Sequence, residues 1–295
     1  MSASGPGGKN AGKNAGKHAG KHAGMHAGMP DLALRLGSAL VMIAAALAAA
    51  WYGGHAFTLF WLAAAVAINW EWQALCGGPR GFLRFALGGA ALAAAAPLAM
   101  RGEPAYALLA IAAGAAGAAA LASPGPRLWS AAGVVYAGAL VVSLGALRGS
   151  LFHGFEAVLW LFAVVWATDI MAYFGGRLIG GPKLWPRVSP SKTWSGFGCG
   201  VLSGALCGLA VAPSTSNIPV VAGLSLAAAI VSQGGDLMES SVKRHFGVKD
   251  ASALIPGHGG LMDRLDGFVA AALFAMLVSV GHVGWTSAAT GLFHW

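Results

Sequence analysis

A polar segment near the C-terminal end of the chain holds the residue types that act on phosphate groups. It runs from Asp236 to Asp266, and apolar segments lie on both sides of it. Only 9% of all residues are charged, and ionisable groups at the edge of a hydrocarbon layer are costly, so their density here predicts a functional site. The residues that we expect to act in catalysis share an ionisable side chain and are Asp236, Lys243, Arg244, Lys249, His258 and Asp263.

The spacing within this segment predicts one shared helix face. Asp236, Ser240 and Lys243 follow one another at helical spacing, and Glu239 lies one turn before Lys243. Carboxylates with lysines and arginines beside them suit Mg²⁺ that bridges a polyphosphate, while the cations neutralise phosphate oxygens. The glycine-rich run 257–260 supplies backbone N–H groups that can approach an anion closely.

Each of these features also has a purely structural interpretation. Asp263 and Asp266 could cap the start of a helix and complement its dipole. Lys243 and Arg244 could be interfacial anchors at the end of a membrane span, and Asp236 could serve only to pair with Lys243. The histidine of the glycine-rich run could make only a structural hydrogen bond.

Two acids lie farther upstream, within apolar stretches. Asp169 has almost no polar neighbours in sequence, so it needs a partner in the fold and is a functional candidate. Glu71 lies between two tryptophans. We expect Glu71 to pair with an arginine such as Arg80 or Arg84, and we assign it a structural role.

Composition places the chain among polytopic membrane proteins. Its mean hydropathy is +0.68, 57% of its residues are hydrophobic, and long apolar runs recur along it. The net charge of +8 forms no basic stripe interleaved with aromatic residues, so we expect no nucleic acid as a partner. We predict an all-α fold with about nine transmembrane helices, at roughly 34–52, 56–75, 82–100, 104–122, 128–146, 156–175, 196–212, 218–239 and 264–285.

The first residues of the chain differ from the rest. Residues 1–30 repeat Gly, Lys, Asn, His and Ala without bulky apolar side chains, which predicts a disordered basic tail ahead of one transmembrane domain at 31–295. His18, His22 and His26 would share a metal only on a helix that the intervening glycines disfavour. A solvated tail that contacts anionic lipid is the favoured interpretation.

The distribution of basic residues predicts the orientation. With the N-terminus in the cytoplasm, nearly all lysines and arginines fall on that side, and only Arg101 and Arg148 lie opposite. The same topology brings the acids of the sixth, eighth and ninth spans to the cytoplasmic ends of their helices. The basic loop 176–195 joins them there, so distant carboxylates and cations are expected to converge at one membrane depth.

Four blocks of sequence carry a family resemblance. They are Asp169-Ile170-Met171-Ala172-Tyr173-Phe174-Gly175-Gly176-Arg177, Ser189-Pro190-Ser191-Lys192-Thr193-Trp194, Gly235-Asp236-Leu237-Met238-Glu239-Ser240, and the segment from Ser240 to Asp266 with Lys243-Arg244, Lys249-Asp250 and Pro256-Gly257-His258-Gly259-Gly260-Leu261-Met262-Asp263-Arg264-Leu265-Asp266. These blocks resemble the signature of the phosphatidate cytidylyltransferase (CDP-diacylglycerol synthase) family and place the catalytic part at about 155–285. The chain departs from the usual pattern at Ser191, Ser195 and Gly267.

The resemblance implies a membrane nucleotidyltransferase that joins CTP and phosphatidic acid to give CDP-diacylglycerol and pyrophosphate. It implies a bacterial inner-membrane location with the active site facing the cytoplasm. A CTP-dependent lipid kinase, a cytidylyltransferase for an isoprenoid lipid and, more remotely, a transporter are the alternatives, and a homodimer is left open.

The resemblance and the residue chemistry together assign the roles. Mg²⁺, with a second cation left open, would be held by Asp236, Asp263, Asp266 and Asp169. The residues expected to bind CTP, phosphatidic acid or membrane lipid are Arg177, Lys192, Ser240, Asp250, Gly259, Gly260 and Arg264.

Overall fold

A computed structural model describes residues 29–255 and 259–295 of the chain. Residues 1–28 of the predicted tail at 1–30, with its histidines, and the signature residues 256–258, with His258, lie outside the described residues. The last two tail residues, Met29 and Pro30, belong to a helix instead. The described elements, in chain order, are α1 (Met29–Tyr52), α2 (Gly54–Cys76), α3 (Gly81–Met100), α4 (Pro104–Leu121), α5 (Arg127–Arg148), α6 (Gly154–Leu178), β1 (Lys183–Trp185), β2 (Ser189–Thr193), α7 (Trp194–Val211), α8 (Ile218–His245), α9 (Met262–Val283), a 3-10 turn (Trp285–Ser287) and α10 (Thr290–Phe293).

The helices confirm a multi-pass membrane protein. Within the described part of the chain, the seven helices α3 to α9 are long and apolar enough to cross a bilayer. The apolar part of α1, Gly37–Tyr52, is shorter. Helix α2 has sufficient length but carries the buried polar residues Asn69, Glu71 and Gln73, which make it less apolar than the other spans.

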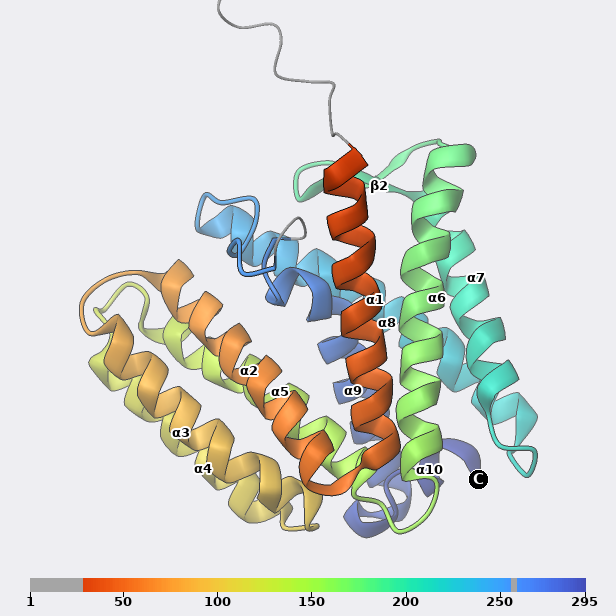
Figure 1. Ribbon diagram of the computed structural model, residues 1–295, viewed down its shortest axis with the longest axis horizontal. Helices are drawn as coiled ribbons and strands as arrows, with labels where there is room; N and C mark the ends of the chain where they lie inside the picture. Colours follow the sequence, from red (N-terminus) through yellow and green to blue (C-terminus); the bar gives the residue numbers. More distant parts are fainter. Residues whose placement is uncertain (1–28, 256–258) are drawn as a thin grey trace, which may run out of the picture.

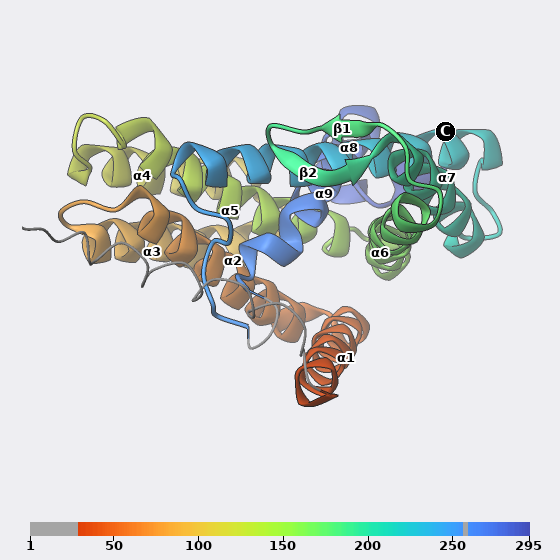
Figure 2. The same cartoon turned by 90° about the horizontal axis from the view of Figure 1, so that it is seen from above.

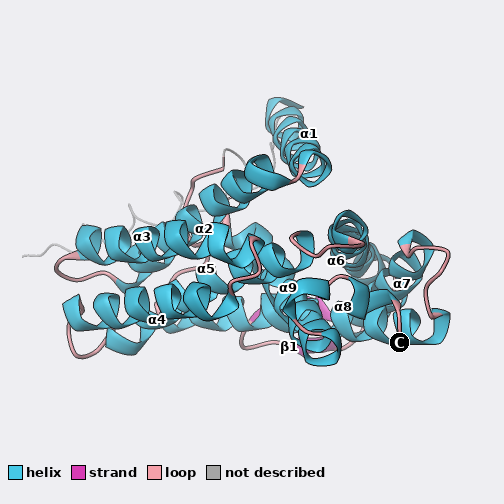
Figure 3. Ribbon diagram, turned by 90° about the horizontal axis from the view of Figure 1, so that it is seen from below, coloured by secondary structure: helices cyan, strands magenta, loops and turns pink. Residues whose placement is uncertain are grey.

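The helices form two groups that meet at α9. Helices α2 to α5 lie side by side as one layered group, and α6 and α7 form the other side of the molecule, with α8 and α9 between them (Figures 1 and 2). Viewed from below, α1 lies at the edge of the molecule, where it contacts α2 and α6 (Figure 3). An aromatic stack joins the groups, because the ring of Phe268 on α9 lies 5.1 Å from that of Trp61 on α2 and 5.4 Å from that of Phe162 on α6.

Helices α6 and α7 approach closely through glycines on α7. A Cβ atom at Gly196 would lie 2.6 Å from the carbonyl oxygen of Ala172, and one at Gly200 would lie 2.7 Å from that of Thr168. One turn later, Gly204 faces the Thr168 hydroxyl. Small residues at this spacing let helix backbones meet in lipid, so α6 and α7 form a tightly packed pair.

A short β-hairpin connects this helix pair, and the sequence did not predict it. Strands β1 and β2 are antiparallel, with Lys183 opposite Thr193 and Trp185 opposite Ser189. The Thr193 hydroxyl then accepts a hydrogen bond of 3.1 Å from the Gly196 N–H and caps α7. The hairpin therefore holds the basic loop in a defined place beside the ends of α6 and α7 (Figure 1).

Candidate active site

A polar cavity of about 770 Å³ opens among the C-terminal elements of the chain. Its volume lies within the range of about 300–1,000 Å³ that is typical of small-molecule sites. The lining comes from α6, the hairpin, α7, α8, the loop after α8 and the start of α9: Asp169, Ala172, Tyr173, Gly176, Arg177, Lys183, Ser191, Lys192, Thr193, Gly196, Phe197, Gln233, Asp236, Lys243, Asp250, Asp263, Arg264 and Asp266.

Most residues that the sequence pointed to meet in this cavity. The four acids expected to hold a cation all line it, and so do five of the other candidates: Arg177, Lys192, Lys243, Asp250 and Arg264. The remaining described candidates, Arg244, Lys249, Ser240, Gly259 and Gly260, do not line it. Convergence of segments that are distant in sequence is therefore confirmed for the acids and for part of the basic set.

Asp169 and Asp236 lie deeper in their helices than their predicted place near the helix ends, whereas Asp263 and Asp266 lie at the start of α9 as expected. Helix α8 continues past the expected end of its span, so Asp236 lies nine positions before the last residue of α8, His245. The same number separates Asp169 from Leu178 at the end of α6. At a rise of about 1.5 Å per residue, each acid lies roughly 14 Å inside its helix. The cavity therefore reaches into the helix layer.

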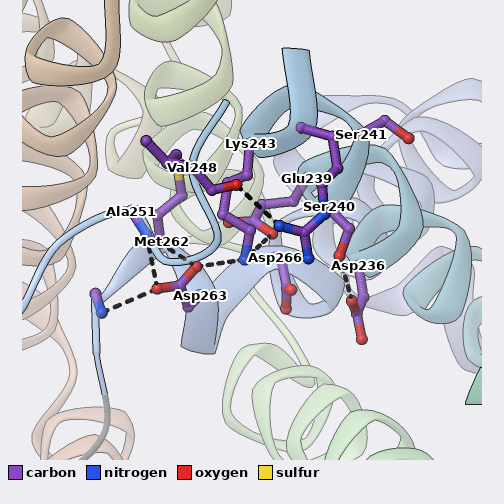
Figure 4. A network of polar contacts seen from close by, with 12 residues as sticks. Asp236, Glu239, Ser240, Ser241, Lys243, Val248, Ala251, Met262, Asp263 and Asp266 are labelled. Atoms are coloured by element: carbon purple, nitrogen blue, oxygen red, sulfur yellow. Dashed lines mark hydrogen bonds and ion pairs between the residues drawn. The ribbon is translucent and has the colours of Figure 1, made fainter. Parts of the chain in front are cut away.

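Lys243 is held between two carboxylates. Its Nζ atom lies 2.8 Å from Glu239 Oε2 and 2.6 Å from Asp263 Oδ1 (Figure 4). Glu239 is fully buried and Lys243 is 8% exposed. These contacts join the start of α9 to α8, and removal of one partner would leave a buried charge uncompensated.

Asp236 has a different partner from the one considered in its structural interpretation. Its carboxylate forms an ion pair with Lys192 on β2, and the Ser240 hydroxyl donates to Asp236 Oδ1 at 3.4 Å. Lys243 belongs instead to Glu239 and Asp263. Asp236 therefore connects α8 to the hairpin within the cavity.

The described N–H groups of the glycine run bond within the protein and are not left for a substrate anion. The Gly259 N–H donates to the Ile255 carbonyl at 3.2 Å, and the Gly260 N–H donates to Asp263 Oδ2 at 3.0 Å. Asp263 also accepts from the Ala251 N–H at 3.1 Å. The glycines shape the loop before α9 and direct it onto the carboxylate.

Two basic candidates lie on the outer surface. Arg244 is exposed and donates to the carbonyl oxygens of Val248, at 3.0 Å, and Val188, at 3.4 Å. Lys249 is also exposed. Arg244 thus connects the end of α8 to the hairpin turn at Val188 and to the loop after α8 at Val248.

Glu71 does not pair with either expected arginine. Its carboxylate accepts hydrogen bonds from Ser252, Leu261 and Met262 in the C-terminal half, while Arg84 donates to the Gly77 carbonyl. The sequence signal was present, since a lone acid inside an apolar helix needs a partner. The identity of that partner depends on a contact between segments nearly two hundred residues apart.

The structure adds lining residues that sequence reasoning did not select. Lys183 belonged to the basic loop but had no assigned role. Gln233 lies one turn before Asp236 on α8, and its Nε2 donates to the Phe197 carbonyl at 3.1 Å. Its helical spacing from Asp236 was the signal that could have identified it.

The carboxylates do not form a preassembled metal centre. Within 29–255 and 259–295, no group of three or more His, Cys, Asp and Glu side chains is arranged to hold one metal ion. The donor chemistry nevertheless fits Mg²⁺, which prefers one or two carboxylates together with phosphate oxygens and water. A cation that binds with a polyphosphate does not require a ready-made protein cage.

The fold and cavity define a multi-pass membrane protein whose site combines basic side chains with carboxylates, as sites for phosphorylated substrates do. Residues 33–280 match the Cytidylyltransferase family, and the chain belongs to that family. Its sequence is 45% identical to the phosphatidate cytidylyltransferases of Brucella abortus (strain 2308) and Brucella suis biovar 1 (strain 1330) over 255 residues, which cover 84% of this chain and 93% of each relative. It is 42% identical to the phosphatidate cytidylyltransferase of Staphylococcus aureus (strain COL) over 124 residues, 40% of this chain and 46% of that one.

Proposed function

We propose that this protein transfers the cytidylyl group of CTP to phosphatidate, giving CDP-diacylglycerol and pyrophosphate. Family membership and extended similarity to phosphatidate cytidylyltransferases support this activity. The observation that carries it is the meeting of Asp169, Asp236, Asp263 and Asp266 with four basic side chains besides Lys243 in one cavity.

The reaction is a phosphoryl-type displacement in which atoms and charge balance. A phosphate oxygen of phosphatidate attacks the α-phosphorus of CTP and forms a new P–O bond. The bond between the α-phosphorus and the bridging oxygen to the β-phosphate breaks, and pyrophosphate leaves with that electron pair. The attacking phosphate is already ionised near neutral pH, so no general base is required. Positioning and neutralisation of charge are therefore the main tasks of the protein.

The basic lining divides into two parts. Lys183 and Lys192 lie on the hairpin, and Arg177 lies at the end of α6. We assign these three to phosphate oxygens of the lipid and nucleotide, together with Arg264 on α9. Lys243 is engaged by two carboxylates, and its role is to hold Asp263 in place beside the substrates.

The carboxylates would hold Mg²⁺. Asp236 and Asp263 are the principal candidates, and Asp266 and Asp169 line the same cavity. Bound Mg²⁺ supplies charge neutralisation for the triphosphate and the leaving pyrophosphate. The protein's contribution is to keep oxygen donors on α8 and α9 at one depth.

Labelled CTP with defined lipids tests the proposal. Purified protein in detergent receives phosphatidate and CTP labelled either at the α-phosphate or at the γ-phosphate. Transfer of the α-label to lipid, with release of pyrophosphate, is expected. Lipid that carries the γ-label would indicate a kinase, and no labelled lipid from phosphatidate would contradict the proposal. Asp263→Asn serves as the site control and should abolish most of the transfer.

A further inference from the structure

A single carboxylate in the N-terminal half reaches the segment that carries the catalytic acids. Glu71 lies on α2 and is fully buried. Among the described residues, none from α1 to α5 lines the cavity. Glu71 therefore does not line the substrate-binding space. Within the described part of the chain, its hydrogen-bond donors are Ser252, Leu261 and Met262.

The carboxylate of Glu71 accepts hydrogen bonds from the backbone N–H groups at the start of α9. Oε1 accepts from the Leu261 N–H at 2.8 Å and from the Ser252 hydroxyl at 2.5 Å, and Oε2 accepts from the Met262 N–H at 2.6 Å. The first N–H groups of a helix have no partner within the helix, and Leu261 supplies no side-chain cap. Glu71 provides that cap from another helix, with the negative charge that a helix N-terminus favours.

The loop before α9 is held by two carboxylates at once. Asp263 accepts from the N–H groups of Ala251 and Gly260, and Glu71 accepts from the residue that follows each of them, Ser252 and Leu261. A Cβ atom at Gly260 would lie 2.9 Å from Glu71 Oε1 and 3.0 Å from Asp263 Oδ2. Gly260 therefore passes between the two acids at a distance that leaves little room for a side chain.

We propose that Glu71 is a positioning residue for the cytidylyl transfer. It sets the place of the first turn of α9, and thereby of Asp263 and Asp266, without contacting substrate. This role rests on the proposed function. It gives the N-terminal half of the chain a specific part in the reaction, in addition to its packing.

Glu71→Gln tests this role because it keeps the shape of the side chain while removing its charge. The glutamine side chain has one oxygen that can accept these hydrogen bonds. Its NH₂ group would replace the other carboxylate oxygen and would face an N–H or O–H donor of the loop. We expect kcat to fall on the order of 100-fold, as a small misplacement of reacting groups can cost. We expect hydrogen–deuterium exchange of peptides covering 250–263, measured without substrate, to rise by about the same factor, because exchange follows local opening.

Gln73→Leu is the matched control. Gln73 is also buried on α2, but it bonds to Ser130 and Asn69 and does not touch the loop. This variant should lose thermal stability while exchange of 250–263 and kcat stay within about twofold of the wild type, because the hydrogen bonds of Gln73 within the described part of the chain include none of the Glu71 partners. Ser252→Ala removes one donor and leaves the Glu71 charge, and it should raise loop exchange by a smaller factor than Glu71→Gln.

The outcomes separate this role from general stability and from the activity itself. A folded Glu71→Gln protein with wild-type kcat and wild-type loop exchange would overturn the proposal, as would an equal rise in loop exchange in Gln73→Leu. If Glu71→Gln does not fold, Ser252→Ala decides, and unchanged exchange and kcat in that variant would overturn it. Absence of CDP-diacylglycerol from the wild type would overturn the proposed function and this role with it, whereas the exchange data would still report the contact.

Discussion

Two clusters of buried polar side chains lie in the membrane-spanning part of the molecule, and they differ in charge and in surroundings. The neutral cluster consists of Asn69, Gln73 and Ser130 between α2 and α5. Ser130 Oγ donates to Gln73 Oε1 at 2.7 Å, and Gln73 Nε2 donates to the Ser130 carbonyl at 2.9 Å. The charged cluster consists of Glu239, Lys243 and Asp263, and two of its members line the cavity.

The contrast shows which property of a buried polar residue indicates function. The neutral cluster bonds within itself and to the Phe85 carbonyl, through Asn69 Nδ2 at 3.1 Å, and none of its members lines the cavity. It fixes how helices pack. The charged cluster holds ionisable groups, and two of them, Lys243 and Asp263, lie next to an open polar space where a substrate phosphate can interact with them. Burial alone does not separate the two, whereas charge beside a cavity does.

Lys243→Met should have the largest effect, because it leaves Glu239 and Asp263 without their cation. Removal of one partner from a buried ion pair typically costs about 3–5 kcal/mol. We expect a loss of that size in the free energy of unfolding, measured by denaturant titration in detergent, together with loss of activity. Glu239→Gln combined with Lys243→Met should recover part of the stability. If Lys243→Met alone lowered the free energy of unfolding by less than about 1 kcal/mol, as for an exposed ion pair, the charged cluster would contribute no more to stability than a surface contact.

Asp236→Asn should act mainly on the chemical step. Asp236 is partly exposed to the cavity and pairs with Lys192, so loss of its charge leaves the fold in place. We expect turnover of CTP and phosphatidate to fall about 10²–10³-fold, the typical effect of removing one electrostatic group from an active site. The control is Ser241→Ala on the same helix, whose hydroxyl donates to the Leu237 carbonyl one turn earlier at 2.8 Å. Turnover of Asp236→Asn within a few-fold of that control would remove Asp236 from the reaction.

Gln73→Leu should lower the stability of the protein and leave its activity nearly unchanged. It leaves Ser130 Oγ and the Ser130 carbonyl without their buried partner, which typically costs about 1–3 kcal/mol. We expect a lower melting temperature in detergent and a kcat within about twofold of the wild type. If kcat fell as far as in Asp236→Asn, the neutral cluster would share the function of the charged one and the distinction would fail.

Lys249→Gln should have the smallest effect. The side chain is exposed and lies outside the cavity lining, where water and salt screen its charge. We expect kcat/KM for CTP to fall by less than about tenfold, with a stronger salt dependence in the wild type than in the variant. A loss as large as that of Asp236→Asn would show that the loop carrying Lys249 closes over bound nucleotide.

The sequence predicted the helices and the set of acids more fully than it predicted their contacts. Apolar runs locate membrane helices because the bilayer fixes their length, and the signature residues located Asp236 and Asp263. The partners of Lys192, Lys243 and Glu71 could not be predicted in the same way. Several opposite charges or donors lie within the sequence reach of each, and three-dimensional packing selects among them.

Two features of local structure near the site could not be predicted from hydropathy: the hairpin and the C-terminal extension of α8. The hairpin at 183–193 is short and polar, so it leaves no apolar pattern. The continuation of α8 to His245 places charged residues in the last turns of a helix, where an apolar window ends too early. These two features decide the depth of Asp236 and the place of Lys192.

The ion pair between Lys192 and Asp236 lets a cation and an anion neutralise each other within the cavity. Under the proposed function, a substrate phosphate would compete with Asp236 for Lys192, and the released carboxylate would become available to Mg²⁺. Binding of nucleotide and binding of metal would then be linked, and each would raise the affinity for the other by the same factor.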